Sequence, residues 1–127
     1  MNPKIKILYV DDEKLNLMLF ESFLSEEYEI FTALNGYRAL ELLVENPEIS
    51  AIFSDLQMPE MDGVEFIRTA KEKYPEKMYS LVTGFSISSP IIQEAMETKL
   101  ITKHLRKPIN KHMLLKIIDE AVNNYCI

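Results

Sequence analysis

The residues of this chain that are best suited to chemistry directly follow, or lie within, short apolar runs. They are the acidic pair Asp11-Asp12 after the run 7–10, Asp55 after 51–54, Thr83 after 79–82, and Lys107 in the segment 105–108. Three carboxylates, one hydroxyl and one ammonium could together bind a divalent cation and neutralise a phosphoryl group. The pattern therefore indicates phosphoryl-transfer chemistry, provided that the fold gathers these side chains.

The elements that must position these groups are predicted from hydrophobic periodicity. Short runs rich in Ile, Val, Phe and Tyr alternate with segments of helical period, which is typical of buried parallel strands joined by crossover helices. Strands are expected at 7–10, 29–33, 50–54, 78–82 and 101–105. The fivefold βα alternation predicts an α/β fold, a three-layer αβα sandwich with five helices on the two faces of one parallel sheet.

The predicted helices carry apolar stripes and cap signals. The sheet-facing residues of the first helix should follow an i, i+3, i+4, i+7 pattern: Asn16, Leu19, Phe20 and Phe23. Leu15 and Met18 would then be only partly covered. Asn35 and Asp62 are expected to begin the next two helices, because such side chains can accept a hydrogen bond from the first free amides.

Parallel strands end at the same edge of a sheet, and ligands bind in the crevice beyond these ends where the strand order reverses. We therefore expect the groups named above to lie within a few ångströms of one another. Asp12 and Asp55 are the candidates for direct Mg²⁺ ligands, Asp11 should hold a metal-bound water, and a backbone carbonyl near Gln57 could supply a further oxygen. Asp55, at the end of the central strand, is the candidate nucleophile.

Length and composition limit the alternatives. The chain of 127 residues fits one domain, 1–127, and its net charge of −6 argues against direct nucleic-acid binding. Its three glycines cannot form a dinucleotide-binding or Walker A loop, so nucleotide cofactors are not expected. With no signal peptide or membrane span in the sequence, we expect a cytoplasmic protein. Cys126, the single cysteine, excludes an internal disulfide.

The motifs Val10 to Glu13, Asp55 to Gly63, Val82-Thr83-Gly84 and Lys107-Pro108 resemble, in identity, order and spacing, those of response-regulator receiver domains. The resemblance runs from about Lys4 to Val122. It implies a flavodoxin-like sheet of order 2-1-3-4-5 and phosphorylation of Asp55 by a phosphohistidine on a sensor histidine kinase or phosphotransfer protein.

The resemblance also implies roles for single residues. Asp11, Asp12, Asp55 and the Gln57 carbonyl would bind Mg²⁺, Thr83 with Gly84 would form the switch, Lys107 would pair with the phosphate, and Lys107-Pro108 would be a cis peptide. A phosphorylated receiver acts on a downstream effector or on an output domain, here missing from the sequence, and can form a homodimer. It is not a turnover enzyme on an external substrate.

The chain departs from the family at several positions. His104 stands where Tyr or Phe is usual, and we expect it to take over the switch position with added pH sensitivity. Lys99-Leu100 and Lys103 replace a small-residue turn and an acidic residue, which argues against the symmetric charged dimer of some members. Gln57 and Phe85 border the path of the hydrolytic water in the family and are predicted to modulate dephosphorylation.

Two other functions compete with this interpretation. A haloacid-dehalogenase-like phosphatase also uses a strand-end Asp with Mg²⁺, but it needs an acid two residues later, where Gln57 lies. A pseudo-receiver that only docks or dimerises would not need the intact set of acidic residues, Thr83 and Lys107.

Overall fold

Strands and helices alternate along the chain, as the periodicity predicts. A computed structural model describes residues 4–84 and 89–125. Its strands are β1 (Ile5–Val10), β2 (Tyr28–Ala33), β3 (Ala51–Asp55), β4 (Met78–Thr83) and β5 (Lys103–Arg106). Its helices are α1 (Lys14–Leu24), α2 (Gly36–Glu45), α3 (Gly63–Lys73), α4 (Pro90–Glu97) and α5 (Lys111–Tyr125). Among these helices, none is long and apolar enough to cross a lipid bilayer.

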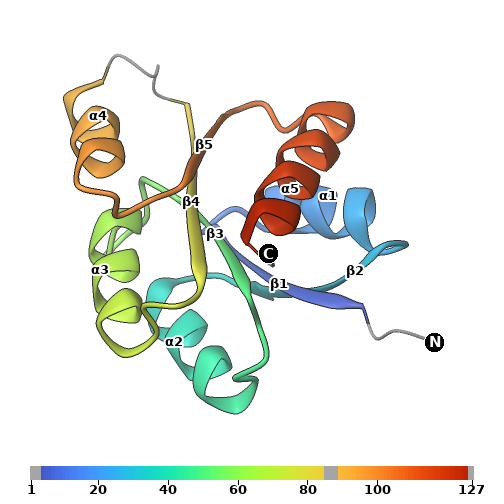
Figure 1. The fold of residues 1–127 in the computed structure, drawn as a ribbon, viewed down its shortest axis with the longest axis horizontal. Helices are drawn as coiled ribbons and strands as arrows, with labels where there is room; N and C mark the ends of the chain where they lie inside the picture. The colour runs from blue at the N-terminus through green and yellow to red at the C-terminus, as the bar shows by residue number, and fades with distance from the viewer. Residues whose placement is uncertain (1–3, 85–88, 126–127) are drawn as a thin grey trace.

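The strands form one parallel sheet in the order β2-β1-β3-β4-β5. Helices α1 and α5 cover one face, and α2, α3 and α4 cover the other (Figure 1). The predicted three-layer α/β sandwich and its strand order are therefore confirmed. Because β1 and β3 are neighbours at the reversal of strand order, their carboxyl ends form the crevice that such sheets use for ligands.

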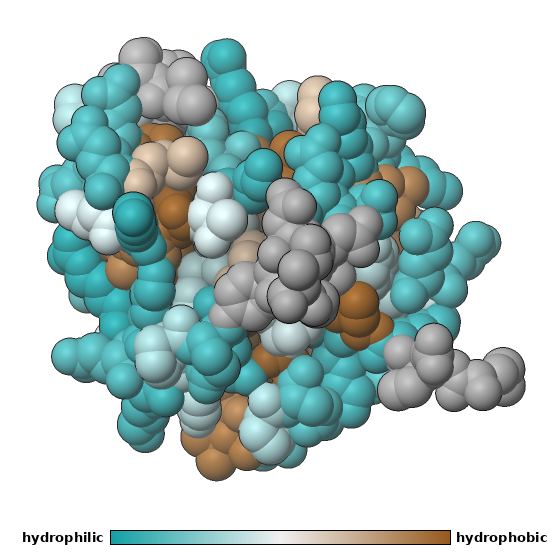
Figure 2. Space-filling model, viewed as in Figure 1, coloured by the Kyte–Doolittle hydropathy of each residue, from teal (hydrophilic) through white to brown (hydrophobic). Residues whose placement is uncertain are grey.

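Each face of the sheet has its own hydrophobic cluster. Leu43, Ile52, Phe66 and Ile92 belong to the cluster under α2, α3 and α4. Tyr9, Phe20, Phe53 and Ile118 belong to the cluster under α1 and α5. Every residue of β3 is buried, because successive side chains point alternately into the two clusters. The outer surface seen in Figure 2 is mainly hydrophilic, and its hydrophobic side chains lie in small separate areas.

The prediction for the sheet-facing side of α1 was correct for Phe20 but wrong for Leu19. The helix buries Leu17, Phe20 and Leu24, whereas Leu19 is exposed and Leu15 and Met18 are 65% and 64% exposed. Asn16 and Phe23 are only partly buried. Apolar residues occupy nearly every side of this helix, so their spacing fits several faces, and contact with β1 and β3 selects among them.

The starts of three other elements show which boundaries the sequence predicts. Strand β5 begins two residues later than expected, because the Ile101 amide donates back to the Ala95 carbonyl of α4 at 3.2 Å. Helices α2 and α3 begin as predicted, since Asn35 accepts from the Arg38 amide and Asp62 from the Glu65 amide, at 2.8 and 2.9 Å.

A buried lysine joins two loops at the amino-terminal edge of the sheet, opposite the crevice. The Lys77 ammonium donates to the Pro47 carbonyl at 2.7 Å and also to the Ile49 carbonyl. It lies 5.3 Å from the centre of the Tyr74 ring. Burial lowers the pKa of Lys77, and nearby carboxylates offset this only in part. The two carbonyls replace part of the water that the ammonium loses.

Candidate functional site

The strand ends bring four of the predicted residues together. Asp11 and Asp12 follow β1, Asp55 is the last residue of β3, and one carboxylate oxygen of each lies within 4.8 Å of the others. The Lys107 Nζ atom lies 3.2 Å from the Oδ2 atom of Asp11 and 3.2 Å from that of Asp55. A single ammonium thus bridges two carboxylates that come from different strands.

Thr83 lies at the end of the next strand. It is buried, and its neighbour Val82 pairs with Asp55 in the sheet register. The Lys107 amide donates to the Thr83 carbonyl at 2.9 Å, which extends the pairing of β4 with the chain beyond β5. The backbone therefore places Thr83 between Asp55 and Lys107. Gly84 is exposed, and a Cβ built there meets no described atom within 4 Å.

Asp11 is held by donors that the sequence interpretation missed. Its Oδ2 atom accepts from the Tyr9 hydroxyl at 2.6 Å and from the Asn16 amide group at 3.2 Å, and its Oδ1 atom accepts from the Glu13 amide at 2.9 Å. Tyr9 had been counted only as part of an apolar run. A period of two places residues 9 and 11 on the same side of an extended chain, and this signal could have identified it.

The charges at the site shift the ionisation of its members. Burial raises the pKa of Asp55, Asp11 raises it further, and Lys107 only partly offsets the two. Burial alone would lower the pKa of Lys107, but the carboxylates of Asp11 and Asp55 outweigh it and raise that pKa. Burial, followed by the hydrogen bond to Asp11, strongly raises the pKa of Tyr9, so its hydroxyl remains a donor. The site has more negative than positive groups, and this excess favours the binding of a cation.

The loop between β3 and α3 lies against the end of β3. The Gly63 amide donates to the Leu56 carbonyl at 2.8 Å, and a Cβ at Gly63 would lie 2.2 Å from the Asp55 carbonyl oxygen. No real side chain tolerates that distance from a backbone atom. Gly63 is therefore required for the close approach that holds the loop over Asp55.

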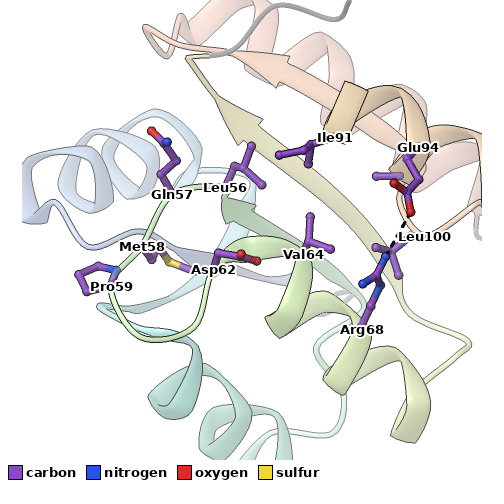
Figure 3. Close-up of a pocket in the computed structure, with 11 residues that line it drawn as sticks. Leu56, Gln57, Met58, Pro59, Asp62, Val64, Arg68, Ile91, Glu94 and Leu100 are labelled. Carbon is purple, nitrogen blue, oxygen red and sulfur yellow. Dashed lines mark ion pairs between the residues drawn. The ribbon is translucent and has the colours of Figure 1, made fainter. Parts of the chain in front are cut away.

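A groove of about 710 Å³ extends from this loop between α3 and α4 (Figure 3). Leu56 and Gln57, the two residues after Asp55, lie at one end of it, and the Arg68–Glu94 ion pair of 3.6 Å lies at the other. Gln57 is exposed, and its side chain points away from that ion pair. The groove thus connects the surroundings of Asp55 with α4.

Hydrogen bonds tie α3 to the turn that follows α4. The Lys71 ammonium donates to the carbonyls of Lys99 and Leu100 in the turn that follows α4. Lys99 has a left-handed backbone with φ of 61°, and the Leu100 amide donates to Ala95 at 2.9 Å. At the other end Ser89 makes no side-chain cap hydrogen bond with the described residues.

The remaining predicted residues lie around this centre. The Lys107–Pro108 peptide is cis. His104 is half-buried on β5, opposite Leu81 in the register, and its role as a switch stays a prediction. Phe85 lies outside the described residues, and its effect on dephosphorylation likewise stays a prediction, as does that of Gln57.

The donor set fits Mg²⁺. Carboxylate oxygens from Asp11, Asp12 and Asp55 are hard ligands, and Mg²⁺ usually takes only one or two of them directly. Asp12 is exposed, and Asp11 already accepts from three donors at Oδ2, counting Lys107. Asp11 therefore has less capacity for a direct metal bond than Asp12 and Asp55, and the division of ligand roles expected from the sequence stays a prediction.

Fold and site together are those of a flavodoxin-like α/β domain with an acidic cation site at its switch point. The family model described as the response regulator receiver domain matches residues 7–119. The chain belongs to this family. It is accordingly a phosphorylation-activated switch of two-component signal transduction, a signalling domain rather than a classical turnover enzyme.

Individual relatives agree with this assignment. Sporulation initiation phosphotransferase F of Bacillus subtilis is 32% identical over 122 residues, which cover 94% of this chain and 92% of that protein. The hydrogenase transcriptional regulatory protein HoxA of Bradyrhizobium diazoefficiens is 32% identical over 119 residues. The match covers 94% of this chain but only 24% of the length of HoxA. The chemotaxis protein CheY4 of Vibrio cholerae has a similar structure, with a TM-score of 0.86 and 28% identity over 94% of this chain and 99% of that one.

Proposed function

We propose that Asp55 accepts a phosphoryl group from a phosphohistidine on a sensor histidine kinase or a phosphotransfer protein. The observation that carries the proposal is the position of Lys107, whose ammonium lies 3.2 Å from both Asp11 and Asp55. In the transfer, an Asp55 oxygen forms a bond to phosphorus as the bond from phosphorus to the histidine nitrogen breaks, and the imidazole leaves with the electron pair. The haloacid-dehalogenase-like alternative lacks its second acid.

Lys107 and Thr83 would bind the transferred group. The product carries roughly −1.5 to −2 charge and strong acceptor oxygens. Lys107 is already held beside Asp55 and can pair with one of these oxygens, while the Thr83 hydroxyl donates to another. Thr83 would have to shift toward the new anion, so that a local charge changes the shape of the β4–α4 region.

Mg²⁺ would be held by Asp12, Asp55 and the Gln57 carbonyl, with Asp11 accepting from a metal-bound water. When bound, the ion neutralises charge on the phosphoryl oxygens and holds them in line for transfer. Lys107 already neutralises one of these ligands, Asp55, together with Asp11. Mg²⁺ would therefore compete with the ammonium for Asp55, and Mg²⁺ affinity should depend on how firmly Lys107 is held.

The phosphorylated form would act on a downstream effector or on an attached output domain. The long hydrogenase regulators that share this domain support an attached output domain. The short sporulation protein supports action on a separate downstream effector. We also propose a phosphorylation-dependent homodimer as a form of the output. No direct contact with nucleic acid or membrane is proposed for this domain.

Incubation with acetyl phosphate and Mg²⁺ tests the proposal. We expect one equivalent of acid-stable label, located on Asp55 by mass spectrometry and lost in Asp55→Ala. Asp62→Asn is the matched control, because it neutralises a nearby carboxylate but keeps the cap of α3. Repeated turnover of phosphate esters would favour the phosphatase alternative, and no label at all would favour a docking module.

A further inference from the structure

We propose that Tyr9 is a positioning residue for the acidic site, and that its hydroxyl holds the Asp11 carboxylate in the orientation that Mg²⁺ binding requires. The inference rests on the proposed function, since it assumes that Asp11 serves the metal. It assigns a role in the signalling chemistry to a core tyrosine.

The hydrogen bond itself is short and excluded from water. Tyr9 is fully buried, and its hydroxyl donates to the Oδ2 atom of Asp11 at 2.6 Å. Asp11 is also fully buried, so its carboxylate depends on protein donors for its solvation. A hydrogen bond to a charged acceptor is stronger than one between neutral groups.

The ring of Tyr9 is fixed by the core beneath the site. It stacks on Phe20 of α1 with ring centres 4.3 Å apart and planes at 19°, and Phe20 in turn lies 5.6 Å from Phe53. Tyr9 and Phe53 are also partners in the register of β1 and β3. Packing therefore determines the position of the hydroxyl, and the hydrogen bond from the hydroxyl orients the Asp11 carboxylate.

Holding Asp11 matters because a second group competes for it. Lys107 lies 3.2 Å from the same Oδ2 atom and would draw a loosely held carboxylate toward itself. The Tyr9 hydroxyl and the Asn16 amide group approach that oxygen as well and restrain it. Loss of a partner that orients a metal-site carboxylate typically weakens metal affinity about 10- to 100-fold.

Tyr9→Phe keeps the ring and removes only the hydroxyl. We expect the Mg²⁺ dissociation constant, measured by calorimetry on the full chain, to rise about tenfold. The ¹³C resonance of the Asp11 carboxyl, assigned by its loss in Asp11→Asn, should shift in the metal-free variant. Tyr79→Phe is the matched control, because this buried tyrosine also donates its hydroxyl, to the Tyr74 carbonyl at 2.8 Å, but lies away from the site. It should leave both readouts unchanged.

Asn16→Ala provides a second test should the tyrosine variant fold poorly. It removes the longer of the two side-chain hydrogen bonds, at the partly buried start of α1, and we expect a smaller loss of Mg²⁺ affinity than in Tyr9→Phe. Unchanged affinity in Tyr9→Phe, or an equal loss in Tyr79→Phe, would overturn the inference while the wild type still binds Mg²⁺ and accepts label on Asp55. A wild type that binds no Mg²⁺ would instead refute the proposed metal site, and the inference with it.

Discussion

Replacing Lys107 by methionine tests the electrostatic reasoning most directly. The substitution roughly preserves the length and volume of the side chain and removes its charge. It leaves Asp11 and Asp55 close together, both nearly inaccessible to water, without the ammonium that bridges them. We expect the metal-free variant to be less stable than the wild type, and we expect Mg²⁺ to restore much of the loss.

The size of the effect follows from the distances. At an effective dielectric constant of about 20, a charge 3.2 Å from its partner contributes roughly 5 kcal/mol before desolvation is counted. The Lys107 side chain is 21% exposed, so water screens part of this and desolvation offsets more. Removing one member of a buried ion pair costs about 3 to 5 kcal/mol. For a domain of this size, a loss of 3 kcal/mol lowers the melting temperature by roughly 10 °C.

Urea denaturation at pH 7 with EDTA, and then with increasing Mg²⁺, measures both parts of the prediction. A ligand at about 100 times its dissociation constant stabilises the folded state by about 2.7 kcal/mol. Because no ammonium competes in Lys107→Met, the variant should bind Mg²⁺ more tightly than the wild type. The difference in the free energy of unfolding should therefore shrink as Mg²⁺ is added.

Lys77→Met is the matched control for a buried lysine. Its ammonium donates to two carbonyls at the opposite edge of the sheet, so its loss should destabilise the protein in a way that Mg²⁺ does not repair. Equal stability of Lys107→Met and the wild type in EDTA would refute the bridging role. If Mg²⁺ raised the free energy of unfolding of both variants equally, the metal would stabilise the fold by binding elsewhere than at this site.

Three further predictions concern the loops and the pH. The raised pKa of Asp55 means that the folded state binds a proton on this carboxylate more readily than the unfolded state does. The free energy of unfolding of the metal-free wild type should therefore increase as the pH falls from neutrality through that raised pKa. Urea titrations of Asp55→Asn should not show this increase. Gly63→Ala should lower the free energy of unfolding by several kcal/mol and reduce labelling by acetyl phosphate, because the loop must move away from β3. Gly84→Ala should leave the free energy of unfolding within about 1 kcal/mol of wild type, because no described atom lies within 4 Å of the added methyl group. Lys71→Met should accelerate amide hydrogen exchange in the α4–β5 turn, whereas Lys73→Met on the same helix should not.

The gathering of the site was predictable because it depends on topology. Once the apolar runs are recognised as parallel strands, Asp11 and Asp55 must end at the same edge, whatever the details of packing. The caps at Asn35 and Asp62 were predictable for a similar reason, since an N-cap acts within four residues of chain. Such local or topological features leave a clear pattern in the sequence.

Features that depend on contact between layers were not predictable from the sequence. The buried face of α1 could not be chosen because Leu15, Met18 and Leu19 are as apolar as the residues that the helix buries. The spacing of Tyr9 and Asp11 places both on one side of the chain, but it does not show that the two side chains form a hydrogen bond. The distance from the Tyr9 hydroxyl to Asp11 depends on the packing of the Phe20 ring against the sheet, which the spacing does not report.

The attachment of α4 has a mechanical consequence. Lys71 holds the turn after the helix and the Arg68–Glu94 pair holds its middle. The first turn is held by the fully buried Ile92, and Ser89 makes no side-chain cap hydrogen bond within the described residues. Apolar contacts are not directional, whereas hydrogen bonds and ion pairs are. A displacement that begins at Thr83 would therefore move the first turn of α4 over the sheet more easily than the left-handed turn at Lys99.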